Sequence, residues 1–305
     1  MVCLPTSPSS HDMRRPGLSV LLRNRLTALA LATPVRTCAI TGTTLPTHFL
    51  HGFRLAMHPD KGDYWFVPRG LEKWQPPART SPNLVEDGGD ASTVGTVPAG
   101  RKSTGPTAWT LSRMDLLKEF FRHTSRYRDK QRTLMRQTTS NMPHVARILD
   151  KAIWRQDMAS FLLEIMRRRV VEGLLFYAEQ VEQDDRKYLI QCDGWEDAKR
   201  YNHRGCLLYF GSEPDLSPGL PVLSTIPIEN VRFGGKLVVH DMRALLTPDQ
   251  LRYLREQSSV LRSGSLLLLG RRRTNDLQLL LWKLQNYISH DHGLGEEISA
   301  GEKAG

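Results

Sequence analysis

The feature that most constrains the fold is an alternation of short apolar runs with capped helical stretches after residue 187. Thr247, Pro248 and Gln250 form the sequence signature of a capping box at the start of a helix. A second helix is expected near the end of the chain, with Thr274 or Asn275 as its N-cap. Apolar runs typical of short buried strands occur at 188–192, 205–210, 226–233, 236–240 and 265–269. This alternation predicts an α/β (α+β) fold in which helices pack on a small mixed sheet.

A long helical segment is predicted to precede this sheet. Apolar side chains recur every three or four residues from about 145 to 182, and the arginine run at 167–169 interrupts this pattern without ending it. A shorter stretch with helical spacing covers 111–137, and Pro143 separates the two. We therefore expect residues 111–290 to form one α/β domain with long helices.

The residues before this domain divide into an apolar block and a linker. In residues 37–74, a turn-rich tetrapeptide at 60–63 separates two runs of β-preferring residues, which predicts a hairpin-like block. Residues 75–110 are rich in Pro, Gly, Ser and Thr, and this composition predicts a flexible linker. At the other end of the chain, residues 291–305 are expected to form a disordered tail.

The first 36 residues have the composition of a mitochondrial transit peptide. Up to residue 59 the only acidic side chain is Asp12, whereas the same stretch contains six arginines. The apolar run at 26–32 can coil as an amphipathic helix, and basic leaders of this kind direct proteins to the mitochondrial matrix. A plain disordered basic arm is the alternative. Nothing in the sequence approaches eighteen consecutive apolar residues, so no integral membrane segment is expected.

Sequence motifs that resemble catalytic or nucleotide-binding signatures lack the context that their chemistry needs. The tetrapeptide at 58–61 resembles the signature loop of J-domain co-chaperones, but the residues after it favour a strand where that family has a helix. Residues 95–104 differ from a P-loop because Arg101 separates the lysine from its glycine. His48 and His51 have no cysteine at a metal-binding spacing. We therefore expect no metal site, no cofactor, no small-molecule substrate and no enzymatic activity.

The charge balance favours a polyanionic partner. The chain has 42 Lys and Arg residues against 32 Asp and Glu residues, which gives a formal net charge of +10. Lys and Arg side chains that neutralise phosphates release counterions, so basic segments with interleaved aromatic residues are candidate nucleic-acid contacts. A solvated helix face is the alternative for the basic stretch near 122–136. The candidate phosphate contacts are Arg126, Arg128, Lys130, Arg132, Arg271, Arg272 and Arg273.

Several segments resemble a fungal family known as required for respiratory growth protein 8. The matching motifs are the LALATPVR run at 29–36 that leads into Cys38, the WFVP motif at 65–68, and the VHDM motif at 239–242 with the elements after it. The resemblance covers the block near 29–71 and roughly 222–288. It implies a mitochondrial protein needed for respiratory growth and for maintenance and expression of the mitochondrial genome, without catalytic residues to carry over. Because 34–36 is part of the resemblance, a cut of the leader before these residues is the alternative to a cut near Arg36.

These observations predict a non-enzymatic mitochondrial factor that supports maintenance and expression of the mitochondrial genome. Its expected partners are mitochondrial RNA, DNA or a ribonucleoprotein. One alternative is a structural component of the mitochondrial ribosome, where basic extensions are usual. Another is a divergent nuclease-like enzyme, which would need converging carboxylates from among Asp193, Glu196, Asp197, Glu229 and Asp241.

Overall fold

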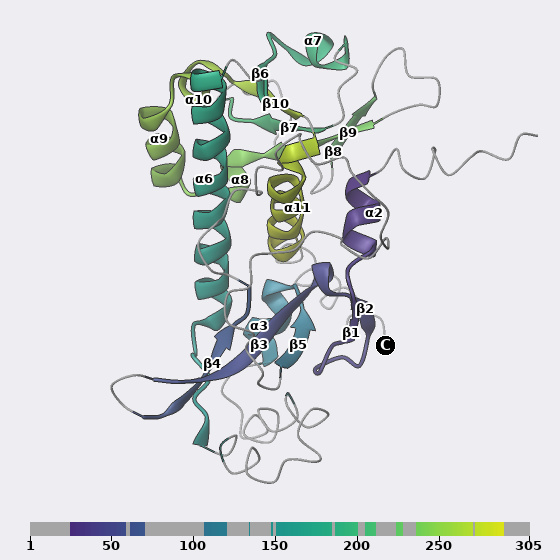
Figure 1. Cartoon of the computed structure of the whole chain (residues 1–305), viewed down its shortest axis with the longest axis vertical. Helices are drawn as coiled ribbons and strands as arrows, with labels where there is room; N and C mark the ends of the chain where they lie inside the picture. Colours follow the sequence, from purple (N-terminus) through teal and green to yellow (C-terminus); the bar gives the residue numbers. More distant parts are fainter. Residues whose placement is uncertain are drawn as a thin grey trace, which may run out of the picture.

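The chain folds as a mixed α/β protein, as the sequence predicts. Figure 1 shows two helices, α6 (Met158–Asp184) and α11 (Asn275–Ile288), that run between a larger sheet at the top and a smaller sheet at the bottom. The computed structural model describes residues 25–58, 62–70, 107–120, 134, 148, 151–184, 187–200, 205–211, 224–227, 236–270 and 272–289.

The larger sheet has the strand order β6-β10-β7-β9-β8 in the part of the chain that the structure describes. Strands β7 and β9 are parallel and the other neighbouring pairs are antiparallel, which confirms the predicted small mixed sheet. The pairing of β8 with β9 agrees with the hairpin signal at 234–235, although β8 begins ahead of its predicted run. The strands are β6 Leu189–Gln191, β7 Gly205–Tyr209, β8 Ser224–Pro227, β9 Lys236–Asp241 and β10 Leu266–Gly270.

Strand β10 is apolar throughout because both faces of this sheet are covered. Leu267 and Leu269 belong to the core that the sheet shares with α6 and α11. Leu266 and Leu268 belong to a second core on the side of α7 (Trp195–Arg200). All four leucines are at most 3% exposed. A strand that is buried on both faces needs no polar alternation, which explains the continuous apolar run.

The segment between β9 and β10 forms three short helices that also pack on the main core. The capping box predicted for α9 is present, because the Thr247 hydroxyl accepts a hydrogen bond from Gln250 N (3.3 Å) and Gln250 Oε1 accepts one from Thr247 N (3.1 Å). Thr274 is the N-cap of α11, as predicted, but its hydroxyl makes no capping hydrogen bond and donates to Gly270 O (2.9 Å) instead. The three helices are α8 Met242–Leu245, α9 Pro248–Gln257 and α10 Ser259–Ser263.

The long helix predicted from about residue 145 is interrupted, because residues 148 and 151 are helical but α6 begins only at Met158. Ile153 instead pairs with the edge of strand β4: its N–H donates to Tyr64 O (2.8 Å) and its carbonyl accepts from Phe66 N (3.0 Å). Such pairing requires an extended backbone, so the helix starts only at Met158.

The smaller sheet has the order β4-β3-β5 and is antiparallel. Strands β3 and β4 form the hairpin predicted within residues 37–74. The predicted linker, 75–110, is wrong at its end, because residues 107–110 belong to β5 and pair with β3. A 3-10 turn, Thr47–Phe49, precedes this sheet and helix α3, Met114–Phe120, follows it. Its strands are β3 Leu50–Met57, β4 Tyr64–Pro68 and β5 Thr107–Leu111.

The fold begins earlier than the predicted leader allows. Helix α2 (Arg25–Leu31) packs against α11, and its Ala30 is fully buried. Strands β1 (Val35–Thr37) and β2 (Thr44–Pro46) then form a two-stranded ribbon. The helix predicted within 26–32 is therefore present, and the prediction of disorder is wrong for residues 25–36, whereas the transit peptide itself stays a prediction. Residues 1–24 and the predicted tail, 291–305, lie outside the described residues.

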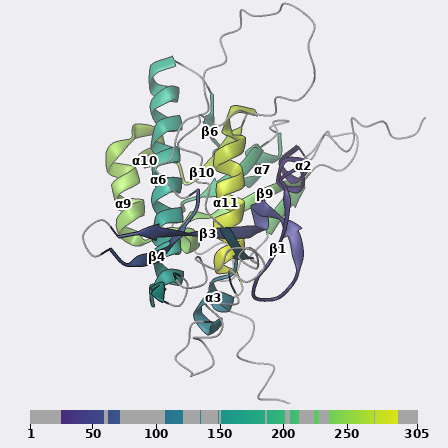
Figure 2. The same ribbon diagram turned by 60° about the horizontal axis from the view of Figure 1, so that its bottom comes forward.

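Helices α6 and α11 connect the two sheets by polar contacts as well as by the core. The Lys283 ammonium of α11 donates to Leu50 O at the start of β3 (2.7 Å). The Arg169 guanidinium of α6 donates to Gly70 O, just after β4 (2.7 Å). In both ribbon views β3 lies across the ends of these helices (Figure 1 and Figure 2). The smaller sheet is therefore fixed to the helices that cover the larger one.

Candidate functional site

A cleft of about 510 Å³ lies at the edge of the larger sheet where the parallel strands β7 and β9 end. Ligands of α/β proteins commonly bind outside the carboxyl ends of parallel strands, because the loops that follow them form a crevice there. Phe210 and Gly211 directly follow β7, and α8 directly follows β9. The lining residues are Phe210, Gly211, Arg243, Pro248, Leu251, Arg252, Arg255, Glu256 and Arg262.

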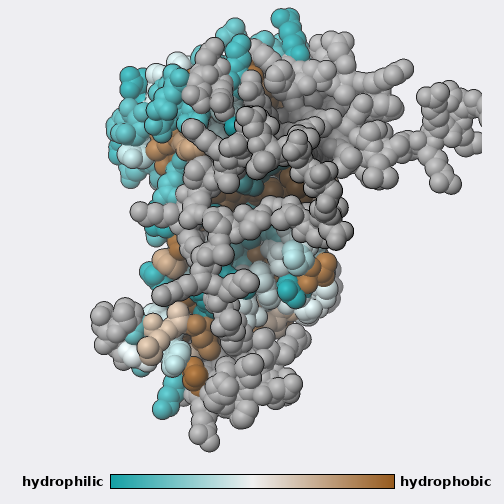
Figure 3. Space-filling model, viewed as in Figure 1, coloured by the Kyte–Doolittle hydropathy of each residue, from teal (hydrophilic) through white to brown (hydrophobic). Residues whose placement is uncertain are grey.

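Helix α9 forms one wall of this cleft. Leu254 is fully buried and fixes the helix against the core. Arg252 and Arg255 are three residues apart and both exposed, so they lie on neighbouring turns and reach the cleft together. The space-filling view shows a largely hydrophilic surface over α9 and α10 (Figure 3). The capping box thus starts a helix whose exposed side presents arginines to the end of β7.

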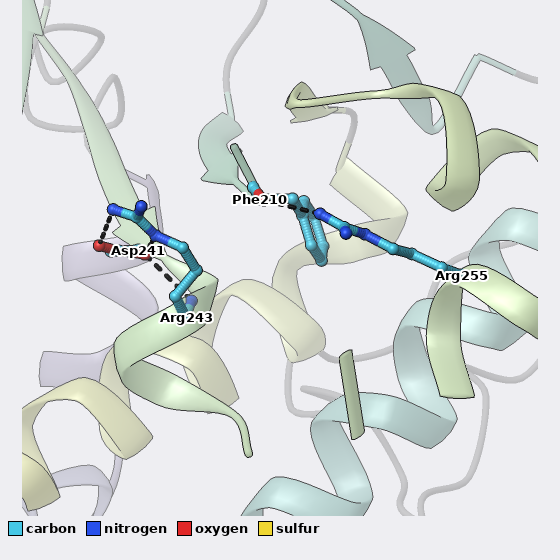
Figure 4. A network of polar contacts seen from close by, with 4 residues as sticks. All are labelled: Phe210, Asp241, Arg243 and Arg255. Atoms are coloured by element: carbon cyan, nitrogen blue, oxygen red, sulfur yellow. Dashed lines mark hydrogen bonds and ion pairs between the residues drawn. The ribbon is translucent and has the colours of Figure 1, made fainter. Parts of the chain in front are cut away.

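Arg255 and Arg262 carry positive charge that no carboxylate within the described residues neutralises. The Arg255 guanidinium donates through Nη2 to Phe210 O (2.9 Å), as Figure 4 shows. The Arg262 guanidinium donates to Arg255 O (3.0 Å) and to Glu256 O (3.2 Å). Backbone carbonyls therefore orient both side chains without cancelling their charge. Each guanidinium has five N–H donors, so donors remain for a ligand.

Arg243 and Arg252, in contrast, carry their own counter-charges. The Arg243 guanidinium donates to both carboxylate oxygens of Asp241 (3.1 and 2.9 Å) and lies 4.7 Å from the centre of the Tyr209 ring. The hydrogen bond with Asp241 raises the pKa of Arg243. Arg252 pairs with Asp249 at 2.5 Å. These two arginines shape the cleft, while the unneutralised charge lies on Arg255 and Arg262.

The cleft does not contain the arginines that the sequence analysis selected. Arg273 is exposed, and its carbonyl accepts a hydrogen bond from the Tyr177 hydroxyl. It follows β10, which is antiparallel to β7, so it lies at the opposite edge of the sheet. Arg272 is described only in its backbone, within the 3-10 turn Arg272–Thr274. The other predicted contacts, Arg126, Arg128, Lys130, Arg132 and Arg271, lie outside the described residues.

Sequence reasoning missed the cleft because its arginines come from separated segments. Arg243 lies just after β9, Arg252 and Arg255 lie on α9, and Arg262 lies on α10. A usable signal was present in α9, where arginines recur on the side opposite Leu254 after an explicit helix start. The convergence of these segments on Phe210 required the parallel pairing of β7 with β9.

The carboxylates considered for a nuclease site do not gather in one place. Asp193 and Asp197 lie together at α7, where Asp193 N donates to Asp197 Oδ2 (3.3 Å). Glu196 pairs with a neighbouring lysine, and Asp241 holds Arg243 at the cleft. Glu229 lies outside the described residues. Across the described ranges, no three His, Cys, Asp or Glu side chains converge in a way that could hold a metal ion.

Of the histidines of β3 and its preceding turn, His51 is buried and His48 is half-buried. His51 is 2% exposed, and its Nε2 lies 3.0 Å from the Ser112 hydroxyl. The His48 ring packs edge-on against Phe49, with ring centroids 5.0 Å apart. Burial, and then the nearby Lys283 ammonium, lower the pKa of His48 to about 4. Both effects lower the pKa of His51 as well, so both imidazoles are neutral near pH 7.

Comparison with family models, with curated proteins and with solved structures found no match to this chain. The resemblance to the respiratory growth family accordingly stays a prediction. Within the described helices, none combines the length and the apolar character needed to cross a membrane.

Proposed function

We propose that this chain is a non-enzymatic mitochondrial factor that binds RNA, DNA or a ribonucleoprotein through the arginine-lined cleft. In this role it would support maintenance and expression of the mitochondrial genome. The observation that carries the proposal is the pair Arg255 and Arg262, whose guanidinium groups face a cleft without a carboxylate partner among the described residues. Arginine forks match the geometry of phosphate oxygens, and phosphate is the anion that nucleic acids present.

The charge of the whole chain supports a polyanionic ligand. A formal net charge of +10 attracts nucleic acid over distances longer than any contact. The mitochondrial part of the proposal is supported by the residues before the fold, where Arg14, Arg15 and Arg23 are opposed only by Asp12. Since α2 belongs to the fold, a cut that leaves the fold intact lies before Arg25.

The proposal is tested by measuring the binding of the purified chain to fluorescent single-stranded RNA and DNA across a salt series. Affinity should fall as salt rises, with a slope of about −0.7 per neutralised phosphate on single strands. The double variant Arg255→Gln/Arg262→Gln should reduce the magnitude of this slope by about 0.7 if both arginines meet one phosphate, and by about 1.4 if they meet two.

A matched control removes two exposed charges away from the cleft, in the double variant Arg168→Gln/Lys187→Gln. Its net charge equals that of the cleft variant, so a general charge effect would weaken binding equally in both. Equal slopes for the two variants would contradict binding in the cleft. Binding that is absent at low salt, or that does not change with salt, would contradict the nucleic-acid function itself.

A further inference from the structure

We propose that the arginine-lined cleft selects a phosphate monoester, carried by the end of a nucleic-acid strand or by a free nucleotide, over an internal phosphodiester. For the end of a strand, the inference rests on the proposed function. For a free nucleotide it does not, because a nucleotide could bind in the same cleft even if the chain bound no nucleic acid. It names one chemical class of ligand, the phosphate monoester, which a general affinity for polyanions would not single out.

The charge of the cleft matches a monoester better than a diester. Arg255 and Arg262 together offer two positive charges that form no ion pair with a carboxylate of the described residues, and Glu256 is the one acidic residue that lines the cleft beside them. A phosphate monoester carries about −1.5 to −2 at pH 7, whereas each internal phosphate of a strand carries a single negative charge. The two charges of a phosphate monoester can balance both guanidinium groups. The single charge of an internal phosphodiester can balance only one of them.

The arrangement of the arginines also indicates one ligand rather than a path along a strand. Proteins that bind single strands without an end preference present positive charge along a groove that follows the backbone. Here the four lining arginines come from α8, α9 and α10 and converge on one cavity of about 510 Å³. That volume lies within the range of about 300–1,000 Å³ that is usual for single small-molecule ligands.

The cleft is chemically divided, which suits a phosphate with an attached nucleoside. Phe210, Pro248 and Leu251 supply an apolar part of the lining, next to the arginines. Phe210 is 2% exposed and is held by the hydrogen bond between its carbonyl and Arg255. The Phe210 ring therefore lies in the core behind the lining, and its carbonyl orients Arg255. A base or sugar can pack on Pro248 and Leu251, which are more accessible, while the phosphate meets Arg255 and Arg262.

The two paired arginines limit where the phosphate can bind. Asp241 holds Arg243 by two hydrogen bonds, and it also accepts one from Arg243 N at the start of α8. Figure 4 shows Arg243 reaching toward Asp241 and Arg255 reaching toward the end of β7. A phosphate at Arg243 would have to compete with a carboxylate that is already in place, so the favoured position lies on the side of Arg255 and Arg262.

The test compares oligonucleotides of one sequence that end in a phosphate or in a hydroxyl, at either the 5′ or the 3′ end, with the full chain. Hydrogen bonds to charged groups are stronger than those to neutral ones, so a terminal phosphate should tighten binding by about tenfold or more. The variant Arg255→Gln/Arg262→Gln should lose this preference, and Arg168→Gln/Lys187→Gln should keep it. Calorimetric titration with uridine 5′-monophosphate and with inorganic phosphate tests the free ligand separately.

Each result decides between the two proposals. A preference for phosphate ends, or binding of the mononucleotide that the cleft variant loses, supports the inference. Salt-dependent binding of all oligonucleotides without an end preference, together with no mononucleotide binding, would overturn it and leave the proposed function standing. Mononucleotide binding without oligonucleotide binding would support it and contradict the proposed function. The variant Arg255→Lys keeps both unpaired charges of the cleft but loses one guanidinium fork, so an intermediate preference for phosphate ends would show that the lost preference of the double variant is not lost folding.

Discussion

Replacing Lys283 by methionine should stabilise the protein near neutral pH, although it removes a hydrogen bond. Lys283 is a partly buried residue of α11, and its ammonium donates to Leu50 O at the end of the smaller sheet (2.7 Å). Burial, and then the charge of Arg169, lower the pKa of this ammonium from 10.5 to about 8. His48 and His51 also face Lys283, but they are neutral near pH 7. The folded protein therefore holds a charge that its surroundings disfavour.

The size of the expected stabilisation follows from the lowered pKa of Lys283. A change of one pKa unit corresponds to about 1.4 kcal/mol, so a fall from 10.5 to about 8 corresponds to roughly 3 kcal/mol below pH 8. Methionine removes this penalty but leaves Leu50 O without its donor, which costs about 1 kcal/mol or more. Near pH 7 the Lys283→Met variant should thus be more stable than the wild type by about 1–2 kcal/mol.

The sign of the effect should change with pH. Between about pH 8 and 10.5 the unfolded chain binds a proton at Lys283 that the folded chain has lost, so wild-type stability gains from rising pH. The advantage of the variant should therefore shrink through this range and reverse at its upper end, where only the lost hydrogen bond counts. Urea unfolding followed by tryptophan fluorescence measures the difference in unfolding free energy between the variant and the wild type at pH 7 and at pH 9.5. The exposed control Lys187→Met should show neither effect.

A Lys283→Met variant that is less stable at pH 7 by 2 kcal/mol or more would refute this reasoning. It would show that the ammonium stabilises the junction between α11 and β3. A stability difference that does not change between pH 7 and 9.5 would refute the assigned pKa.

Three further substitutions test the packing and the helix start, each by urea unfolding. Leu268→Ala should cost about 2–5 kcal/mol, because this residue is fully buried in a sheet that is covered on both faces; a loss below about 1 kcal/mol would contradict the second core. Tyr287→Phe should cost about 1–3 kcal/mol, since the buried hydroxyl donates to Ala159 O (2.9 Å), and no loss would show that this bond is dispensable. Thr247→Ala should cost about 1 kcal/mol through the lost cap, whereas Thr247→Ser should restore most of it.

Features that depend on neighbours in sequence were predicted well. The capping box of α9 was readable because Thr247 and Gln250 satisfy each other within one turn. The β3–β4 hairpin was readable because a short turn separates two runs of β-preferring residues. The strand β10 was readable because the apolar run at 265–269 is typical of a short buried strand. Local chemistry decides each of these features, so a single sequence contains the signal.

Features that depend on distant residues were not predictable in the same way. The apolar spacing before Met158 suits a helix, but an edge strand far away in sequence captures Ile153 in an extended conformation. The apolar run at 26–32 suits a cleavable leader, yet α2 packs against α11 near the other end of the chain and its Ala30 is fully buried. The cleft is the least predictable feature, because its arginines are brought together beside Phe210 by the pairing of β7 with β9.

The most direct test of the account is to locate bound nucleic acid on the chain by ultraviolet crosslinking to 4-thiouridine RNA and mass spectrometry of the crosslinked peptides. The account predicts crosslinks in the segments that line the cleft, 210–211 and 243–262. These crosslinks should disappear in the variant Arg255→Gln/Arg262→Gln and persist in Arg168→Gln/Lys187→Gln. Crosslinks confined to residues 122–136 or 271–273, and unchanged in the cleft variant, would contradict the central claim that the cleft is the binding site.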